Sequence, residues 1–245
     1  MMRTKTRIGL IVGGCILVSL SILAALIVWL GTIPGVLTGA LIAAIMVAAY
    51  VTAIGPWQRR WGATDQEVRR VMPGDDMPPA AAASSTRAIT IDAPPGAVFP
   101  WLLQIGYGRG GWYSYDWIDN DGRPSVERIV PELQGLAVGD QVVMIPGMGP
   151  TVRAIERDRL LLFGDAESGT WCLTLDPTDD GHCRLVSRWR QHWDVTPASA
   201  PWIAISDPGA FLMERRMLKN LKRLAESIPA TDASVGQPAR EGGAR

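Results

Sequence analysis

The amino-acid sequence predicts an α+β protein in which a two-helix transmembrane hairpin precedes a curved antiparallel sheet and a long C-terminal helix. Three observations support this class. Residues 8–54 carry no charge, short strand patterns recur between residues 86 and 193, and residues 208–228 have an amphipathic helical pattern. Strand patterns that follow one another without intervening helices indicate an antiparallel meander, not alternating βαβ units.

Residues 1–56 are expected to form the hairpin, with helices at about 8–30 and 34–55. Each helix can cross a hydrocarbon core of about 30 Å, because a helix rises about 1.5 Å per residue. The Gly/Pro connector between them leaves room only for a tight antiparallel turn. A buried helical hairpin in a soluble core and a cleavable signal peptide are the alternative explanations of the pattern.

Basic residues flank both apolar segments: Arg3, Lys5, Arg7, Arg59 and Arg60. The positive-inside rule therefore predicts that both termini and the soluble domain are cytoplasmic, at the inner (plasma) membrane.

Small residues at four-residue spacing, in the pairs Gly9/Gly13 and Gly35/Gly39, allow close approach of helices in lipid. These pairs could pack on the partner helix of the hairpin, or on a second protomer in a homo-oligomer formed through the membrane helices.

Residues 57–85 are predicted to be a juxtamembrane helix and a linker. Thr64 and Glu67 have the spacing of a capping box, and Pro73-Gly74 ends the short helix that follows. Its arginines could face lipid headgroups, or the helix could be a plain connection. The soluble domain is expected at 86–228, and residues 229–245 are expected to be a disordered tail because they are rich in Ala, Gly and charge.

Within the soluble domain, the alternation of 86–92 predicts a strand and Pro94-Pro95 opens a helix that continues to residue 105. Further strands are expected at 140–145, 151–156, 159–164, 169–176 and 183–193. The helix at 208–228 is expected to lie across the concave face of the sheet and to enclose a cavity. By strand alternation, Arg188 and Arg190 point to the outer face as solvated charges.

Composition argues against several functional classes. The formal net charge of zero removes the electrostatic basis for a nucleic-acid partner. Two histidines cannot supply a His-rich metal site, and no phosphate-binding or dinucleotide-binding glycine pattern is present, so no metal and no cofactor is expected. Strand alternation places Cys172 and Cys183 on opposite faces of the sheet, where they cannot form a disulfide.

The chain resembles the SRPBCC superfamily, also called START-like or birch-pollen-allergen-like, and within it the membrane-anchored bacterial proteins described as polyketide cyclase/dehydrase-like. The matching stretches lie within residues 57–228, at Trp57–Thr64, Pro73–Asp75, Arg87–Gly106, Arg109–Trp117, Val138–Asp140 and Arg215–Leu218. The resemblance implies a helix-grip fold with a hydrophobic ligand cavity. It implies no particular activity, because this superfamily includes carriers, cyclases and regulators.

The candidate ligand-binding side chains are aromatic residues and methionines: Trp112, Tyr113, Tyr115, Trp117, Met144, Trp171, Trp189, Met213 and Met217. Aromatic rings offer apolar area with a polar edge, and methionines adapt to varied apolar ligands. The same side chains could instead fill an ordinary core.

Asp116 is the candidate acid or base, since a carboxylate among aromatic rings would have its ionised form desolvated. The structural alternatives are pairing with Arg109 or Arg128, or capping of a short helix.

Three functional hypotheses follow. The leading one is a membrane-tethered domain that binds a hydrophobic small molecule or lipid from the bilayer. The second is a cyclase or dehydratase acting on a polyketide-like or aromatic substrate, for which Asp116, the tyrosines, Gln191 and His192 are the available polar groups. The third is a membrane-anchored interaction module without a pocket.

Overall fold

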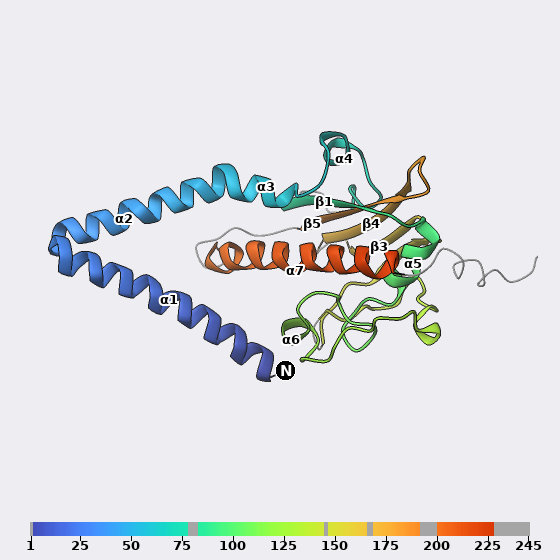
Figure 1. The fold of residues 1–245 in the computed structure, drawn as a ribbon, viewed down its shortest axis with the longest axis horizontal. Helices are drawn as coiled ribbons and strands as arrows, with labels where there is room; N and C mark the ends of the chain where they lie inside the picture. The colour runs from blue at the N-terminus through green and yellow to red at the C-terminus, as the bar shows by residue number, and fades with distance from the viewer. Residues whose placement is uncertain (1, 78–82, 145–146, 166–168, 192–199, 228–245) are drawn as a thin grey trace, which may run out of the picture.

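The computed structural model describes residues 2–77, 83–144, 147–165, 169–191 and 200–227. The predicted disordered tail and His192 lie outside these ranges. The described chain contains an N-terminal helical hairpin and a sheet with a long helix lying along it (Figure 1).

The hairpin consists of α1 (Met2–Leu30) and α2 (Thr32–Ala49), which diverge from a shared turn as the arms of a V (Figure 1). A π-helical turn, η1 (Tyr50–Ile54), and α3 (Gly55–Arg59) continue α2 toward the sheet. Two segments, Gly13–Leu30 and Thr32–Arg59, are long and apolar enough to cross a membrane. The ability of these segments to span a membrane rests on their length and composition, which are the features from which the sequence predicts a transmembrane hairpin.

One of the two glycine pairs packs within the hairpin. A Cβ atom on Gly35 would lie 2.6 Å from Cα of Ile27, and one on Gly39 would lie 2.8 Å from Cδ1 of Leu23. These glycines therefore allow α1 and α2 to approach closely. A Cβ atom on Gly9 or Gly13 would meet no atom within 4 Å, so self-association through that pair stays a prediction.

The sheet has five antiparallel strands in the order β1-β5-β4-β3-β2. The strands are β1 (Ala83–Ile91), β2 (Val152–Glu156), β3 (Leu160–Asp165), β4 (Gly169–Pro177) and β5 (Cys183–Gln191). The α+β prediction is confirmed, and β1 begins three residues earlier than expected.

The strand predicted at 140–145 is wrong. Gln141 forms only an isolated bridge with Thr151, and the N–H of Val142 donates to the carbonyl of Pro150 at 3.0 Å. Pro150 has no N–H to return, so a regular ladder cannot continue through this pair.

The helices that follow the hairpin are α4 (Asp65–Arg69), α5 (Pro95–Leu103), α6 (Asp116–Asp119), the 3₁₀ turn η2 (Pro131–Leu133) and α7 (Ala200–Glu226). The predicted start of the last helix at Pro208 is wrong, because α7 begins eight residues earlier and carries Pro208 in its interior. Proline suits a first helical turn, but here it does not mark one.

The sheet buries both faces. Toward α7, Trp171, Leu173 and Leu185 pack with Leu218 and Leu221 of the helix, and Cys183 belongs to this inner cluster. On the other face, the outer cluster contains Met72, Ala88, Leu160, Leu162, Cys172 and Val186. The two cysteines therefore lie on opposite faces, as strand alternation predicts.

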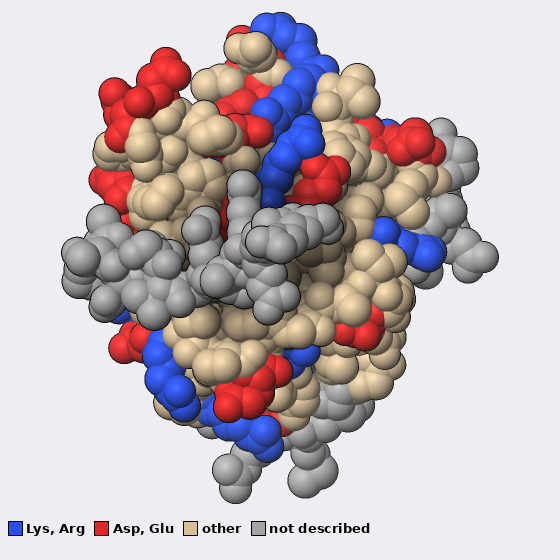
Figure 2. Space-filling model, turned by 90° about the vertical axis from the view of Figure 1, so that its right-hand side faces the viewer, with Lys and Arg blue, Asp and Glu red and all other residues tan. Residues whose placement is uncertain are grey.

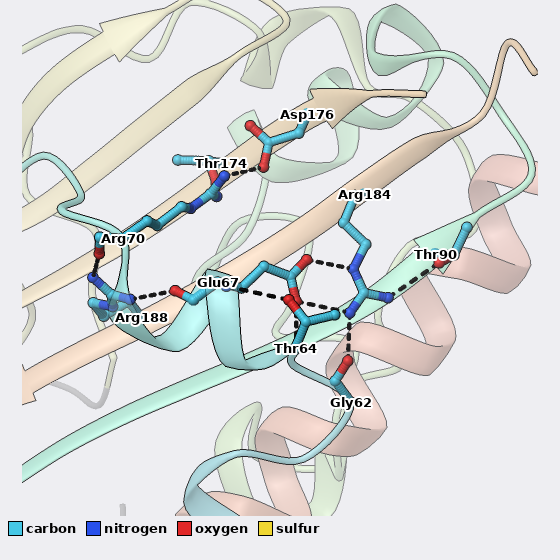
Figure 3. Close-up of polar contacts among 9 residues, drawn as sticks. All are labelled: Gly62, Thr64, Glu67, Arg70, Thr90, Thr174, Asp176, Arg184 and Arg188. Atoms are coloured by element: carbon cyan, nitrogen blue, oxygen red, sulfur yellow. Dashed lines mark hydrogen bonds and ion pairs between the residues drawn. The ribbon is translucent and has the colours of Figure 1, made fainter. Parts of the chain in front are cut away.

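Residues 62–77, here called the outer strap, cover the outer face. The strap contains the predicted capping box, in which Thr64 and Glu67 exchange side chain–backbone hydrogen bonds. Two arginines of β5 hold it in place: Arg184 pairs with Glu67, and Arg188 donates to the carbonyl oxygens of Glu67 and Arg70 (Figure 3). Arg188 also donates to the carbonyl oxygen of Val68 and to the carboxylate of Asp75.

The expectation that Arg188 is a solvated charge is therefore wrong. Its side chain is only 4% exposed, because the outer strap folds over it and supplies hydrogen-bond acceptors for the guanidinium. Arg190, in contrast, is half-buried beside Asp75.

Candidate functional site

A stack of aromatic rings runs across the inner face of the sheet. Trp171 of β4 and Trp189 of β5 are paired directly opposite each other, and their rings stack with centroids 4.5 Å apart and an interplanar angle of 12°. Phe163 of β3 stacks on the other side of Trp171 at 5.2 Å, and Trp112 lies 5.8 Å away. Cross-strand pairing explains the stack, because opposite residues on one face of a sheet are close neighbours.

A buried chain of polar contacts starts at this stack. Nε1 of Trp171 donates to Oγ of Ser187 at 2.9 Å, and the Ser187 hydroxyl donates to the carboxylate of Glu214 on α7. The same carboxylate pairs with the guanidinium of Arg87 on β1, whose Nε donates to the carbonyl oxygen of Gln58 at 2.9 Å. The chain therefore joins the aromatic stack, α7, β1 and α3.

Sequence reasoning missed this polar chain, although one signal was available. Glu214 stands on the apolar stripe of α7, at helical spacing between Phe211 and Leu218, where a charged residue needs a buried partner.

An opening of about 60 Å³ reaches the stack at Trp189. Its other lining residues are Arg59, Ala83, Ser84, Ser85, Gln191 and Asp207. The carboxylate of Asp207 accepts a hydrogen bond from the Tyr50 hydroxyl at 2.9 Å and pairs with Arg59 at 3.1 Å. One rim of the opening is therefore tied to the end of the hairpin.

The structure divides the predicted ligand-binding residues into two groups. Trp112, Tyr113, Trp171 and Met217 are buried in the inner core, each less than 10% exposed, and Met144 and Trp189 pack against that core from half-buried positions. Met213 is half-buried on α7. These positions are compatible with both core packing and ligand contact.

Tyr115 and Trp117 form the second group, near the surface at α6. Their rings meet edge to face at 6.4 Å, and the guanidinium of Arg216 lies over the Tyr115 ring at 4.4 Å. Trp117 is 38% exposed. The aromatic side chains of residues 112–117 thus do not line one common site.

Tyr113 holds the loops beside the core. Gln104 donates to its hydroxyl, and the carbonyl oxygen of the same Gln104 side chain accepts from the N–H of Val130 at 3.0 Å. Burial raises the pKa of Tyr113 to about 12, so its hydroxyl stays protonated at neutral pH.

Asp116 does not make the expected ion pairs. Its carboxylate accepts the Ser125 hydroxyl at 2.6 Å, while the guanidinium of Arg109 donates to the carbonyl oxygens of Leu103 and Leu133. The alternative that Asp116 pairs with Arg109 is therefore wrong, because the half-buried guanidinium is already bound to backbone acceptors.

Asp119, one helical turn after Asp116, is the perturbed carboxyl group of this segment. Burial first, and then the nearby charge of Asp116, raise its pKa to about 7, and Ser114 opposes this shift in part. Sequence reasoning missed Asp119. The available signal was the i, i+3 spacing of two carboxylates within an aromatic segment.

Two other groups with potential reactivity are the buried cysteines Cys172 and Cys183. Burial raises the pKa values of Cys172 and Cys183 to about 12, which leaves both as thiols. No group of three His, Cys, Asp or Glu side chains among the described residues could hold a metal ion.

A second, shallow groove of about 500 Å³ lies between β1 and the end of α7, away from the aromatic stack. It is lined by Ile89, Lys219, Lys222, Arg223, Glu226 and Ser227. On the face drawn in Figure 2, basic side chains stand beside acidic ones, in keeping with the balanced charge of the sequence.

Comparison with known proteins gives similarity of fold. No protein-family model and no curated protein matches the chain. Among solved structures, a polyketide cyclase-like protein from Corynebacterium glutamicum is 19% identical, with 58% of this chain and 91% of that chain covered and a TM-score of 0.36. A protein from Mesorhizobium loti is 16% identical over 58% and 96% of the two chains, with a TM-score of 0.36.

The Aha1 dimer from Colwellia psychrerythraea is 12% identical over 55% and 93% of the two chains, with a TM-score of 0.31. These are distant similarities to solved structures, and the resemblance to the SRPBCC superfamily stays a prediction of the sequence. At these identities and TM-scores, no ligand or activity is carried over from these proteins.

Proposed function

We propose that this protein is a membrane-tethered cytoplasmic domain that binds a hydrophobic small molecule or lipid, which enters at the Trp189 opening. One observation carries the proposal: the aromatic stack of the inner face reaches the surface at Trp189, beside the end of the helical hairpin. An aromatic floor under a polar rim suits a molecule with an apolar body and a polar end.

The exposed surface of the hairpin supports the membrane tether. Val28 is 81% exposed and Trp29 is 88% exposed, and the two candidate spans are not buried by the rest of the protein. A soluble core hairpin would bury such side chains. A bilayer supplies the apolar surroundings that this surface lacks in water.

The position of the opening supports a ligand taken from the bilayer. Trp57 and Arg59 lie at the end of the second candidate span, and such residues are typical of the membrane–water interface. Because Arg59 lines the opening, the opening would lie at the level of the lipid headgroups. A tether at this position raises the local concentration of a membrane-derived ligand.

The volume of the opening limits how the ligand binds. About 60 Å³ is well below the roughly 300–1,000 Å³ typical of pockets for drug-sized ligands. We therefore expect that the ligand inserts one end at Trp189 and widens the space between β5 and the first half of α7. Asp207, which belongs to α7 and lines the opening, would move with the helix.

Photo-crosslinking tests this proposal. The full chain is reconstituted in nanodiscs that contain a phospholipid with a diazirine near the end of its acyl chain, and crosslinked peptides are identified by mass spectrometry. We expect crosslinks around Trp189 and a strong loss of them in Trp189→Ala, while Trp117→Ala leaves them unchanged. Equal crosslinking in both variants would count against a site at Trp189.

Dense packing of the inner face favours the interaction module as the second candidate function. Trp171 is only 2% exposed and is held by Ser187, so the centre of the core has no need of a ligand to fill it. Nanodisc-embedded protein that takes up no lipid and yields no crosslink in the soluble domain would favour this candidate.

A further inference from the structure

The segment around α6 contains a concentration of buried oxygen atoms without hydrogen-bond partners. They are Oγ of Ser114, both carboxylate oxygens of Asp119 and Oδ1 of Asn120. The Ser114 hydroxyl lies close enough to the Asp119 carboxylate to lower its pKa, but the two groups do not meet in hydrogen-bond geometry. The three residues are 6%, 6% and 4% exposed. Roughly 90% or more of buried polar groups in proteins have a partner, so four such atoms within seven residues require an explanation.

These atoms are close to a second carboxylate. Asp116 lies three residues before Asp119 in α6, which places both side chains on the same side of the turn. The Ser125 hydroxyl donates to one oxygen of the Asp116 carboxylate, Oδ1. Two carboxylates and two neutral oxygen groups thus come from one short stretch of chain.

Oxygen atoms of this kind attract hard cations. Calcium takes carboxylate, amide carbonyl, hydroxyl and water oxygens in an irregular coordination shell, whereas magnesium demands a near-ideal octahedron and keeps several of its waters. Softer metals prefer His and Cys, and neither residue type occurs between Ser114 and Asn120. The chemistry therefore favours a calcium-type ion.

We propose that Ser114, Asp116, Asp119 and Asn120 form a binding site for a hard divalent cation of the calcium type. Four protein residues supply part of its coordination shell, and water completes it. A bound cation would satisfy the buried oxygen atoms and neutralise two adjacent negative charges. The site shares no residue with the Trp189 opening.

A cationic side chain is the competing occupant. The first turns of α1 lie beside α6 (Figure 1), and the sequence has Arg3, Lys5 and Arg7 there. We favour the ion because the four oxygen atoms are already closed off from solvent, and a compact ion needs less room than a long side chain.

Terbium luminescence tests the proposal on the full chain in detergent micelles after treatment with a chelator. Tb³⁺ binds calcium sites, and nearby tryptophans such as Trp112 and Trp117 can excite it. We expect a saturable signal that Ca²⁺ displaces and Mg²⁺ displaces at least tenfold less effectively. Ca²⁺ should also raise the thermal unfolding midpoint.

Three variants make the result decisive. Asp119→Asn should weaken Tb³⁺ binding at least tenfold, and Ser114→Ala should weaken it less; circular dichroism confirms that both are folded. Asp180→Asn removes an exposed carboxylate from the β4–β5 turn and should leave binding unchanged. Absence of a saturable signal, or the same signal in all variants, would overturn the proposal. A more stable Asp119→Asn protein with no response to any cation would also overturn it and indicate a side-chain cation.

Discussion

The guanidinium of Arg87 and the carboxylate of Glu214 form an ion pair in the interior of the protein, with side chains 3% and 7% exposed. Arg87 comes from β1 and Glu214 from α7, so the pair fastens the long helix to the edge strand that follows the outer strap. Ser187 and Gln58 provide further hydrogen bonds to the two charges. The pair thus connects the aromatic stack with the segment that leads to the hairpin.

Removal of one partner should be strongly destabilising. Glu214→Ala leaves the Arg87 charge buried without a counter-charge, and we expect a loss of about 3–5 kcal/mol in the free energy of unfolding. Glu127→Ala breaks the exposed pair with Arg223 and should cost less than about 1 kcal/mol. Chemical denaturation of both variants measures the difference. Comparable losses of unfolding free energy in the two variants would show that the buried ion pair does not hold α7 to β1.

Substitutions in the aromatic stack should separate stability from ligand binding. Trp171→Ala removes a fully buried ring, and a loss of about 3–5 kcal/mol is expected. Trp189→Ala removes a half-buried ring at the opening. It should lower the free energy of unfolding less than Trp171→Ala does, and it should reduce the amount of bound ligand more. Denaturation curves and the amount of copurified lipid in native mass spectra test this order. The reverse order would place the site deeper in the core.

The outer strap should loosen when its arginine anchor is removed. Arg188→Met keeps the length of the side chain but deletes its bonds to Asp75 and to three carbonyl oxygens. We expect faster hydrogen exchange in residues 64–77 and a stability loss of about 2–4 kcal/mol. Arg153→Met, which deletes a single hydrogen bond from the guanidinium to the carbonyl oxygen of Gly164, is the control. Unchanged exchange in the strap would contradict its anchoring by Arg188.

The carboxyl group of Asp119 should make stability depend on pH when a chelator is present. Its pKa of about 7 in the folded protein exceeds the roughly 3.9 of an unfolded chain, so the folded state holds this proton more tightly. The resulting stabilisation is present below about pH 4 and is lost as the pH rises through about 7, by up to about 4 kcal/mol.

The thermal midpoint of the wild type, relative to that of Asp119→Asn, should therefore fall between pH 4 and pH 7. The comparison with the variant removes the contributions of the other acids. Parallel pH profiles for the two proteins would argue against the raised pKa.

Close packing of the hairpin should depend on one glycine pair. Gly35→Ala places a Cβ atom against the backbone of Ile27, and the overpacking should cost about 1–3 kcal/mol and separate α1 from α2. Gly13→Ala adds the same methyl group where no atom lies within 4 Å and should have little effect. Distances between spin labels on the two helices, measured in nanodiscs, would reveal the separation. An equal effect of both substitutions would point to helix contacts outside the chain.

Much of the fold follows from local patterns in the sequence. The uncharged stretch of 8–54 predicts the hairpin, because only apolar residues at helical length suit lipid. Alternation places Cys172 and Cys183 on opposite faces, since the side-chain period of a strand is two. The capping box of Thr64 and Glu67 is equally local, because its bonds join residues three positions apart.

Contacts between distant segments were decided by the tertiary structure alone. The sequence shows that Arg188 points outward, but only the folding of the outer strap over the sheet makes it a buried anchor. Likewise, Glu214 stands on an apolar stripe, and its partner Arg87 lies 127 positions away. No periodicity encodes such a distance, because pairing across a fold depends on how separate elements pack. The raised pKa of Asp119 has the same origin, since burial is a property of the assembled chain.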